Sequence, residues 1–345
     1  PDFLERTIPH LAPGVAVVQT RWGHLNGERS GLTRAQVLAL DGHFLVEHPT
    51  RSRLGLFLNF NGTGGVWRRE AIDAAGGWQG DTLSEDVDLS YRAQLAGWRI
   101  VFLEDVVVPG EIPTTVLAFK RQQRRWAMGT TQVLRKLGGA VLRSDRPLYV
   151  RLHAVLTLAT HLAQPISLTL FLLAPLVLAY HPRFNAALGV LTFVALGPPL
   201  MYAVAAAEIH ADWPRRLTVY PLLLVLSIGL SLNGTVAVCR ALAGQAPVFE
   251  RTPKTGGAGT GTRTGAGSPA PGYAQRMDRW LVVEAVLAAY AWMGLIAAVR
   301  QGMTGLAMFL ALFAAGYTLV VGLSVRGLAW RRFTPPVPHA PAGER

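Results

Sequence analysis

Arg121-Gln122-Gln123-Arg124-Arg125-Trp126 is the stretch that decides how this chain is interpreted, because it stands directly before a series of long apolar segments. It offers guanidinium groups, which meet phosphate oxygens in a forked geometry, together with amides and a flat indole ring. An acidic Ser84-Glu85-Asp86 lies about 36 residues earlier. These groups are what a membrane enzyme would need to bind an anionic sugar donor and a sugar acceptor.

Composition divides the chain of 345 residues into two parts. Half of the residues are hydrophobic and the mean hydropathy is +0.29. Residues 1–149 carry most of the acids and are typical of a soluble region, whereas 152–325 holds charge-poor runs close to the roughly 20 residues that cross a bilayer. The single Cys239 excludes an intrachain disulfide and a multi-cysteine zinc site.

The net charge of +12 raises the question of a nucleic-acid partner. The basic residues, however, stand at the ends of apolar segments rather than along one soluble face, and retention on the cytosolic side of a membrane explains this placement better. The sequence therefore predicts an integral protein of the cell membrane with a cytosolic catalytic part. It predicts the lipid bilayer as a partner, and no nucleic acid polymer.

The first part of the chain has an α/β pattern. Apolar strands are expected at 15–19 and 98–103, each after a turn that contains glycine. Between them, 84–96 is typical of a helix, with Ser84 as a possible N-cap. The fold class is thus α/β over 1–112, continuing into interfacial helices and an all-α transmembrane region.

The basic amphipathic stretch at 113–149 predicts helices that lie along a membrane surface, with the alternative of a surface helix packed on the protein core. Five charge-poor segments follow, at 152–180, 184–207, 217–239, 280–299 and 303–325. If all five crossed the membrane, the basic residues after Cys239 and those of the tail would lie outside, against the positive-inside rule.

We therefore predict four crossings, with 217–239 re-entrant or interfacial. The resulting divisions are 150–239 for the first transmembrane helices with this segment, 240–279 for a flexible cytosolic loop, 280–325 for a transmembrane pair and 326–345 for a basic cytosolic tail. Glu284 could line a channel or reach the interface. Phe171, Tyr202, Tyr290 and Trp292 could stack on a glycan or simply pack, and His153 and His161 receive no role.

Sugar transfer with inversion needs a carboxylate that takes the proton of the attacking hydroxyl and positive charge for the departing diphosphate. Glu85 and Asp86 supply the carboxylates, and the dipole of the helix that they begin is expected to keep them ionised. Gln122, Arg124, Arg125 and Trp126 supply the other groups. The alternatives are ordinary acids at a helix start and a solvated basic face with Trp126 as a membrane anchor.

Several ordered motifs resemble those of the processive family 2 glycosyltransferases, the cellulose synthase group. Ser84-Glu85-Asp86 and Gln122-x-x-Arg125-Trp126 are similar to two of its motifs, and Gln19-Thr20 is similar to its Gln-Thr strand end. Phe60-Asn61-Gly62-Thr63-Gly64-Gly65 resembles the acceptor loop of this family, and its sequence is most similar to that of the glucomannan synthase-like branch. Phe249-Glu250-Arg251-Thr252-Pro253-Lys254 resembles the cytosolic gating loop of the family, but Arg251 stands where the family has Val.

The resemblance implies a partial GT-A-type domain and assigns roles. Asp86 would be the general base, with Glu85 beside it, and Gln122, Arg124, Arg125 and Trp126 would contact donor diphosphate and acceptor sugar. Phe60, Asn61, Gly62 and Thr63 would border the terminal sugar of the growing chain. Phe249, Thr252 and Lys254 would belong to a loop that closes over the nucleotide.

The resemblance also implies an absence. The family binds its nucleotide and a divalent metal through an early Asp and an Asp-x-Asp, both of which would precede Pro1. We therefore expect no metal ligands in this chain, Mg²⁺ or Mn²⁺ in the full-length enzyme, and no turnover by this portion alone.

The leading hypothesis is a membrane-embedded, inverting, processive β-glycosyltransferase. It would polymerise sugar from UDP-glucose or GDP-mannose onto a growing polysaccharide and export the glycan. A nonprocessive enzyme with a lipid acceptor is the alternative, and a noncatalytic membrane scaffold or transporter is the second alternative.

Overall fold

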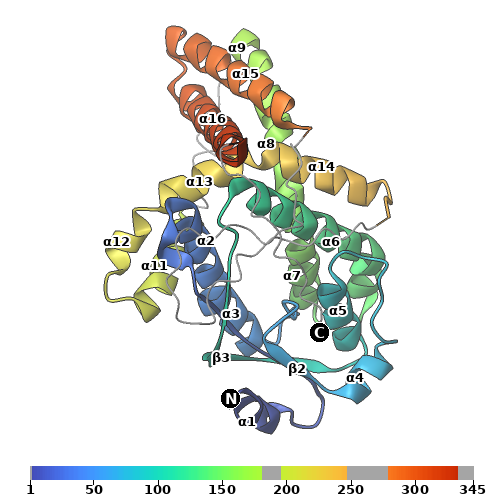
Figure 1. The fold of residues 1–345 in the computed structure, drawn as a ribbon. Coiled ribbons are helices and arrows are strands. Elements are labelled where there is room, and N and C mark those ends of the chain that lie inside the picture. The colour runs from blue at the N-terminus through green and yellow to red at the C-terminus, as the bar shows by residue number, and fades with distance from the viewer. Residues whose placement is uncertain (1, 181–195, 247–278, 333–345) are drawn as a thin grey trace, which may run out of the picture.

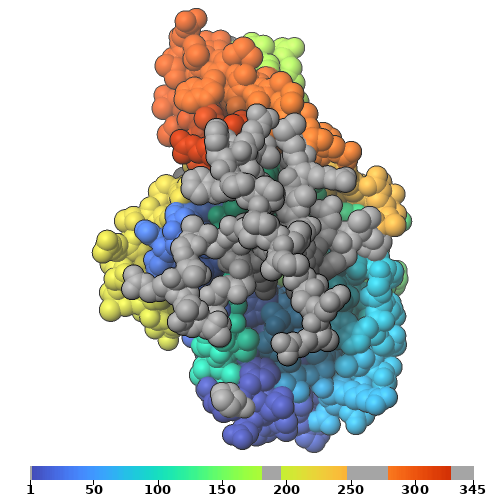
Figure 2. Space-filling view, in the orientation of Figure 1, coloured from blue at the N-terminus to red at the C-terminus, as the bar shows by residue number. Residues whose placement is uncertain are grey.

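The computed structural model describes residues 2–180, 196–246 and 279–332, with side chains up to 327. An α/β layer lies at one end and apolar helices lie at the other (Figure 1). Figure 2 shows the same division on the molecular surface, with the orange C-terminal helices at the top and the blue and cyan α/β layer at the bottom. This confirms the expected fold class, an α/β region followed by helices.

A mixed sheet forms the centre of the α/β layer. Its strand order is β2-β1-β3, with β1 antiparallel to β2 and parallel to β3. The strands are β1 Val15–His24, β2 Gly65–Trp67 and β3 Arg99–Gly110. The predicted strands at 15–19 and 98–103 are therefore present, and both extend further toward their C-terminal ends than predicted.

Both faces of β1 are covered, and its first six residues are buried. Because successive side chains of a strand point to opposite faces, Ala16 and Val17 enter two different clusters. Ala16 packs with Leu89 and other residues on α4 Arg69–Ala74 and α5 Glu85–Leu95. Val17 packs with Leu58 and its neighbours in the loop that leads to β2. The strand thus fixes both the acceptor-type loop and α5.

Helix α5 begins one residue after Ser84, as predicted, but the Ser84 side chain makes no capping hydrogen bond. The reason is packing. A Cβ built on Gly129 would collide with the Ser84 hydroxyl, so helix α6 Val116–Arg143 crosses the chain directly at this point. The Ser84 hydroxyl is held against α6 and is not turned back to the α5 amides.

Helix α6 connects the two parts of the molecule. Thr115 caps it by accepting a hydrogen bond from the Ala118 amide at 3.3 Å, and half of its 28 residues are buried. It contacts α5 and three later helices, α7 Leu148–Leu158, α14 Ser231–Leu242 and α16 Thr304–Arg332. Much of the amphipathic stretch is therefore packed within the protein, which corresponds to the alternative weighed for it from sequence.

The remaining helices before the apolar pair are short. They are α1 Phe3–Thr7, η1 Ile8–His10, η2 Gly27–Arg29, α2 Gly31–Gly42, η3 His43–Glu47, α3 His48–Arg53, α7 Leu148–Leu158, η4 Thr160–Leu162, α8 Ala163–Leu172, α9 Ala174–Tyr180, α11 Gly197–Ile209, α12 Trp213–Leu217, α13 Tyr220–Gly229 and α14 Ser231–Leu242. The apolar pair is α15 Leu281–Arg300 and α16 Thr304–Arg332.

Two helices in the described residues are long and apolar enough to cross a bilayer, at Leu281–Arg300 and Thr304–Gly327. Two bent helix pairs, at 148–172 and 213–242, would raise the number to four if each were one span. The second pair bends by 46° at Leu230, inside the segment predicted to be re-entrant or interfacial. The number of crossings stays a prediction.

Glu284, for which the sequence leaves a channel position and an interfacial position open, lies against helix α6 in the structure. It is fully buried, and its two carboxylate oxygens accept hydrogen bonds from the Lys120 ammonium of α6 at 2.6 and 2.8 Å. Sequence reasoning missed this partner because the two residues are 164 positions apart. The pair ties α6 to the first apolar helix of the C-terminal pair.

Candidate functional site

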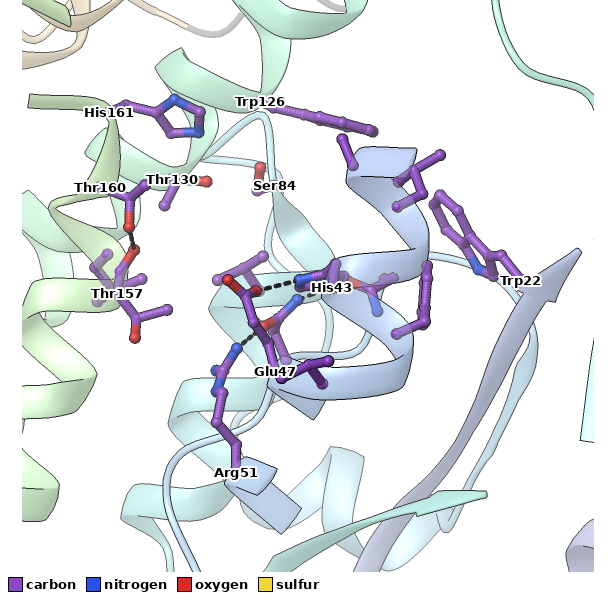
Figure 3. A pocket seen from close by; sticks show the side chains of 18 of the residues that line it. Trp22, His43, Glu47, Arg51, Ser84, Trp126, Thr130, Thr157, Thr160 and His161 are labelled. Carbon is purple, nitrogen blue, oxygen red and sulfur yellow. Dashed lines mark hydrogen bonds and ion pairs between the residues drawn. The ribbon is translucent and has the colours of Figure 1, made fainter. Parts of the chain in front are cut away.

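A cavity of about 720 Å³ lies between the α/β layer and helices α6, α7, α11 and α13. Four of the predicted site residues line it, namely Asn61, Asp86, Gln122 and Trp126. Figure 3 shows Trp126 at one edge, with His43 and Glu47 deeper in the pocket. Asp86 and Trp126 therefore share one cleft, although they belong to different helices.

Asp86 lies in the first turn of α5 and is half-buried. One carboxylate oxygen accepts a hydrogen bond from the Val87 amide at 2.8 Å. Burial, aided by the nearby charge of Glu85, raises the pKa of Asp86 to about 6, against the opposing effects of the Val87 amide and Arg125. Desolvation thus opposes the helix dipole that is expected to keep this carboxyl ionised, and it has the larger effect on the pKa.

The acceptor-type loop is held beside Asp86 by side chains from β1. Gln19 is fully buried, and its Oε1 accepts a hydrogen bond from the Asn61 amide at 2.9 Å. Its Nε2 donates to the Thr63 and Gly64 carbonyl oxygens at 3.1 and 3.0 Å. The Gln-Thr strand end noticed in the sequence is thus the anchor of this loop.

Gly62 shows how closely the loop approaches the carboxylate. Its φ of +76° lies in the left-handed region that favours glycine, and a Cβ there would stand 3.0 Å from Asp86 Oδ2. A side chain at this position would therefore meet the carboxylate and strain the backbone at once. The two motifs form one wall of the site.

Helix α6 contributes an amide and an indole ring to the cavity. Gln122 and Trp126 are four residues apart, which places them on one face of the helix, and both line the cavity. Arg124 points elsewhere, because its Nε donates to Asn233 Oδ1 of α14 at 2.9 Å. Arg125 is near enough to Asp86 for its charge to lower the pKa of that carboxyl.

Of the predicted site residues in the described ranges, six do not line the cavity, namely Phe60, Gly62, Thr63, Glu85, Arg124 and Arg125. The Phe60 ring is buried in the core and packs edge-on against Trp67 with ring centroids 5.7 Å apart. Glu85 is exposed. Thr63 lies near the site mainly through its carbonyl oxygen, which also accepts from Trp22 Nε1 at 3.3 Å. The predicted gating residues Phe249, Thr252 and Lys254 lie outside the described residues.

Sequence reasoning missed part of the lining. His43 and Glu47 form an ion pair with 2.7 Å between Nδ1 and Oε2. His153 and His161, left without a role, line the same cavity. Tyr202 lines it as well, whereas Phe171 is buried and stacks on Phe313 among the apolar helices. No periodicity in the sequence brings these residues together.

The described residues hold no group of three or more His, Cys, Asp and Glu side chains that could hold a metal ion. Within the described residues, the site therefore offers no cluster of metal ligands. Its chemistry consists of a carboxylate with a raised pKa, neutral amides, an indole face and nearby guanidinium groups.

These features define an α/β protein with apolar helices and a concave cleft, which is lined by a carboxylate, amides and an indole ring. A family model described as glycosyl transferase family group 2 matches residues 1–207, which is more than half of the chain. The chain belongs to this family, and the resemblance inferred from the motifs is confirmed.

Similar proteins include glucomannan mannosyltransferases, in agreement with the branch of the family that the motifs resemble. Glucomannan 4-beta-mannosyltransferase 1 of Oryza sativa subsp. japonica is 43% identical over 158 residues, which are 45% of this chain and 30% of that protein. Glucomannan 4-beta-mannosyltransferase 2 of Arabidopsis thaliana is 45% identical over 148 residues, which are 42% of this chain and 28% of that protein. The aligned region thus spans less than a third of these relatives.

A solved structure is also similar. It is a mannosyltransferase of Pyrobaculum calidifontis in complex with GDP-Man and Mn²⁺, with a TM-score of 0.39 and 19% identity. The match covers 70% of this chain and 58% of that one.

Proposed function

We propose that the full-length protein is an inverting, processive β-glycosyltransferase that extends a polysaccharide from a nucleotide sugar. The observation that carries the proposal is the meeting of Asp86, Gln122 and Trp126 at one cavity of about 720 Å³. The names of the relatives favour a mannosyl donor such as GDP-mannose over UDP-glucose. Export of the glycan past the apolar helices belongs to the same proposal.

In the proposed reaction, the Asp86 carboxylate takes the proton of an acceptor hydroxyl. The hydroxyl oxygen then bonds to the anomeric carbon of the donor sugar, while the bond from that carbon to the phosphate oxygen breaks and its electrons leave with the diphosphate. A pKa of about 6 suits a base that works near neutral pH. The Trp126 indole stacks on a pyranose ring, and Gln122 hydrogen-bonds sugar hydroxyls.

The Arg125 guanidinium, next to this carboxylate, would face the negative charge of the departing diphosphate. The Mg²⁺ or Mn²⁺ expected from the family resemblance has no cluster of ligands in the described residues. The ligands of such an ion would lie outside the residues that the structure describes.

The test is substitution of Asp86 by Asn in the full-length protein in membranes, supplied with radiolabelled GDP-mannose or UDP-glucose. Loss of the base should lower transfer about 10²- to 10⁴-fold, with normal expression and unchanged nucleotide binding. Gel analysis of the wild-type product separates a polymer from a lipid carrying a single sugar, the alternative product. Full transfer by the Asp86→Asn protein would refute the proposed mechanism.

A further inference from the structure

The long helix under the cavity contains one π-helical turn. Helix α2 continues through η3 His43–Glu47 into α3, and the His48 amide donates to the His43 carbonyl oxygen, five residues earlier. The wider turn brings His43, Glu47 and His48 together on one side, where the two imidazole rings lie 4.4 Å apart. Turns of this type inside α-helices occur frequently at functional sites.

A chain of hydrogen bonds leads from this turn to the loop beside Asp86, and its direction is fixed at one end by an arginine. Arg51 can only donate, so its contact with Asn59 Oδ1 at 3.2 Å makes that atom an acceptor. Asn59 Nδ2 then donates to Asn61 Oδ1 at 2.6 Å. Asn61 Nδ2 is consequently the donor to His48 Nε2 at 3.2 Å.

The two imidazole rings continue this chain toward Glu47. His48 Nε2 lies 2.9 Å from His43 Nε2 as well as 3.2 Å from Asn61 Nδ2. Burial, with the charges of His43 and Arg51, holds the pKa of His48 well below its usual range. On the other side of its ring, His43 Nδ1 lies 2.7 Å from Glu47 Oε2.

The Glu47 carboxylate at the end of this chain faces open space. Its side chain is 46% exposed, it lines the cavity, and Figure 3 shows it between its own helix and the helix that bears Thr157. Burial raises the pKa of Glu47, but the hydrogen bond from His43 and nearby positive charges outweigh it, so the net pKa is lowered. An ionised carboxylate therefore points at whatever occupies this part of the cavity.

We propose that the paired Glu47 and His43 form a second acceptor subsite, which holds hydroxyl groups of the sugar next to the reacting one in a β-linked oligosaccharide. This inference rests on the proposed function. Carboxylates bind hydroxyl donors through strong charge-assisted hydrogen bonds and repel a diphosphate, so the group fits the acceptor and not the donor. A cavity of about 720 Å³ falls in the size range that encloses ligands larger than one sugar ring.

The hydrogen-bond chain gives this subsite a link to the chemistry. A sugar held at Glu47 stabilises one arrangement of Asn61, and the next residue is Gly62, where an added Cβ would lie 3.0 Å from Asp86 Oδ2. An acceptor of two or more units would thus be seated against the catalytic carboxylate by contacts that a single sugar lacks. Thr157 and Thr160 line the same cavity, and their hydroxyls donate to the carbonyl oxygens of His153 and Thr157 (Figure 3).

The test is binding of β-1,4-linked mannotetraose and cellotetraose to the purified full-length protein, measured by calorimetry. Glu47→Gln removes the charge and keeps the shape, and it should weaken binding of the preferred tetrasaccharide about 10- to 100-fold. The affinity for the nucleotide sugar should not change. Glu47→Asp, which keeps the charge on a shorter side chain, should recover part of the loss.

The matched control is Glu70→Gln, because Glu70 is an exposed glutamate on α4. It should bind both tetrasaccharides as the wild type does. Unchanged tetrasaccharide binding in Glu47→Gln, an equal loss of nucleotide affinity, or no binding of either tetrasaccharide by the wild type would each overturn the subsite. These outcomes leave the proposed function standing if the wild type transfers sugar and Asp86→Asn does not.

Discussion

Asp86 is governed by two opposing influences, and their balance decides what this residue can do. Its place in the first turn of α5 favours the ionised form, whereas burial beside Gly62 and Glu85 favours the protonated form. Burial dominates, and the carboxylate becomes a stronger base than an exposed aspartate. The sequence identifies the residue but not the balance, because desolvation depends on the loop that packs over it.

This balance predicts the pH dependence of the reaction. A general base must be ionised, and with a pKa of about 6 the ionised fraction of Asp86 falls as the pH drops through that value. Turnover at saturating donor and acceptor should therefore decrease about tenfold from pH 7 to pH 5. Initial rates measured over pH 4.5–8 (roughly the range that brackets this titration) test it, and a flat profile across pH 6 would contradict the assignment.

At the scale of elements, the site depends on how closely α6 crosses the start of α5. Gly129 permits this contact, since a Cβ there would lie 2.8 Å from the Ser84 backbone nitrogen. Trp126 lies one turn earlier on the same helix and Asp86 lies two residues after Ser84. The crossing therefore sets the spacing of the indole and the carboxylate.

Gly129→Ala should disturb this spacing, because the Ser84 backbone cannot move aside as a flexible side chain could. We expect a destabilisation of about 1–3 kcal/mol from overpacking and a loss of about 100-fold in transfer from the displaced groups. Thermal unfolding and initial rates of the full-length protein measure the two effects.

Gly139→Ala on the same helix is the control for that substitution. There the new Cβ would approach only the Arg143 guanidinium, at 3.3 Å, and this group is free to move. The exchange should stabilise the helix by up to about 1 kcal/mol and leave transfer unchanged. Equal behaviour of the two variants would show that the α5–α6 contact does not position the site.

The elements also mark the limit of sequence reasoning. Strand β1 and helix α5 could be predicted from local patterns of apolar and polar residues, whereas Gln122 and Trp126 of α6 were identified through the resemblance of their motif to that of the family. The π-turn at His43–Glu47 could not, since no spacing in the sequence distinguishes it from an α-helix. The burial of the Phe60 ring was missed for a related reason: it depends on Trp67 and on contacts across the sheet.

At the scale of the whole molecule, α6 couples the α/β layer to the apolar helices through buried polar contacts. Asn233 of α14 accepts from Arg124 and donates to the Lys120 carbonyl oxygen at 3.0 Å. The Lys120 side chain in turn reaches Glu284 of α15. Helix α6, which bears Trp126, is therefore linked by side-chain contacts to both α14 and α15.

The Lys120 and Glu284 pair is the contact whose removal should matter most, because both side chains are almost completely shielded from solvent. Glu284→Ala leaves a buried ammonium without its carboxylate, and we expect it to cost about 3–5 kcal/mol of unfolding free energy. Replacing both residues by apolar ones, Lys120→Met with Glu284→Leu, should restore most of that stability. Thermal unfolding of the full-length protein in detergent compares the variants.

The exposed pair of Arg216 and Glu28, with 28% and 65% of their side chains accessible, provides the comparison for a surface contact. Glu28→Ala should cost no more than about 1 kcal/mol. If Glu284→Ala cost as little, the buried pair would not connect the two parts of the molecule. If instead the apolar double variant is stable yet transfers sugar poorly, the charges serve to position Gln122 and Trp126 on α6, because packing alone then fails to set the helix in register with the cavity.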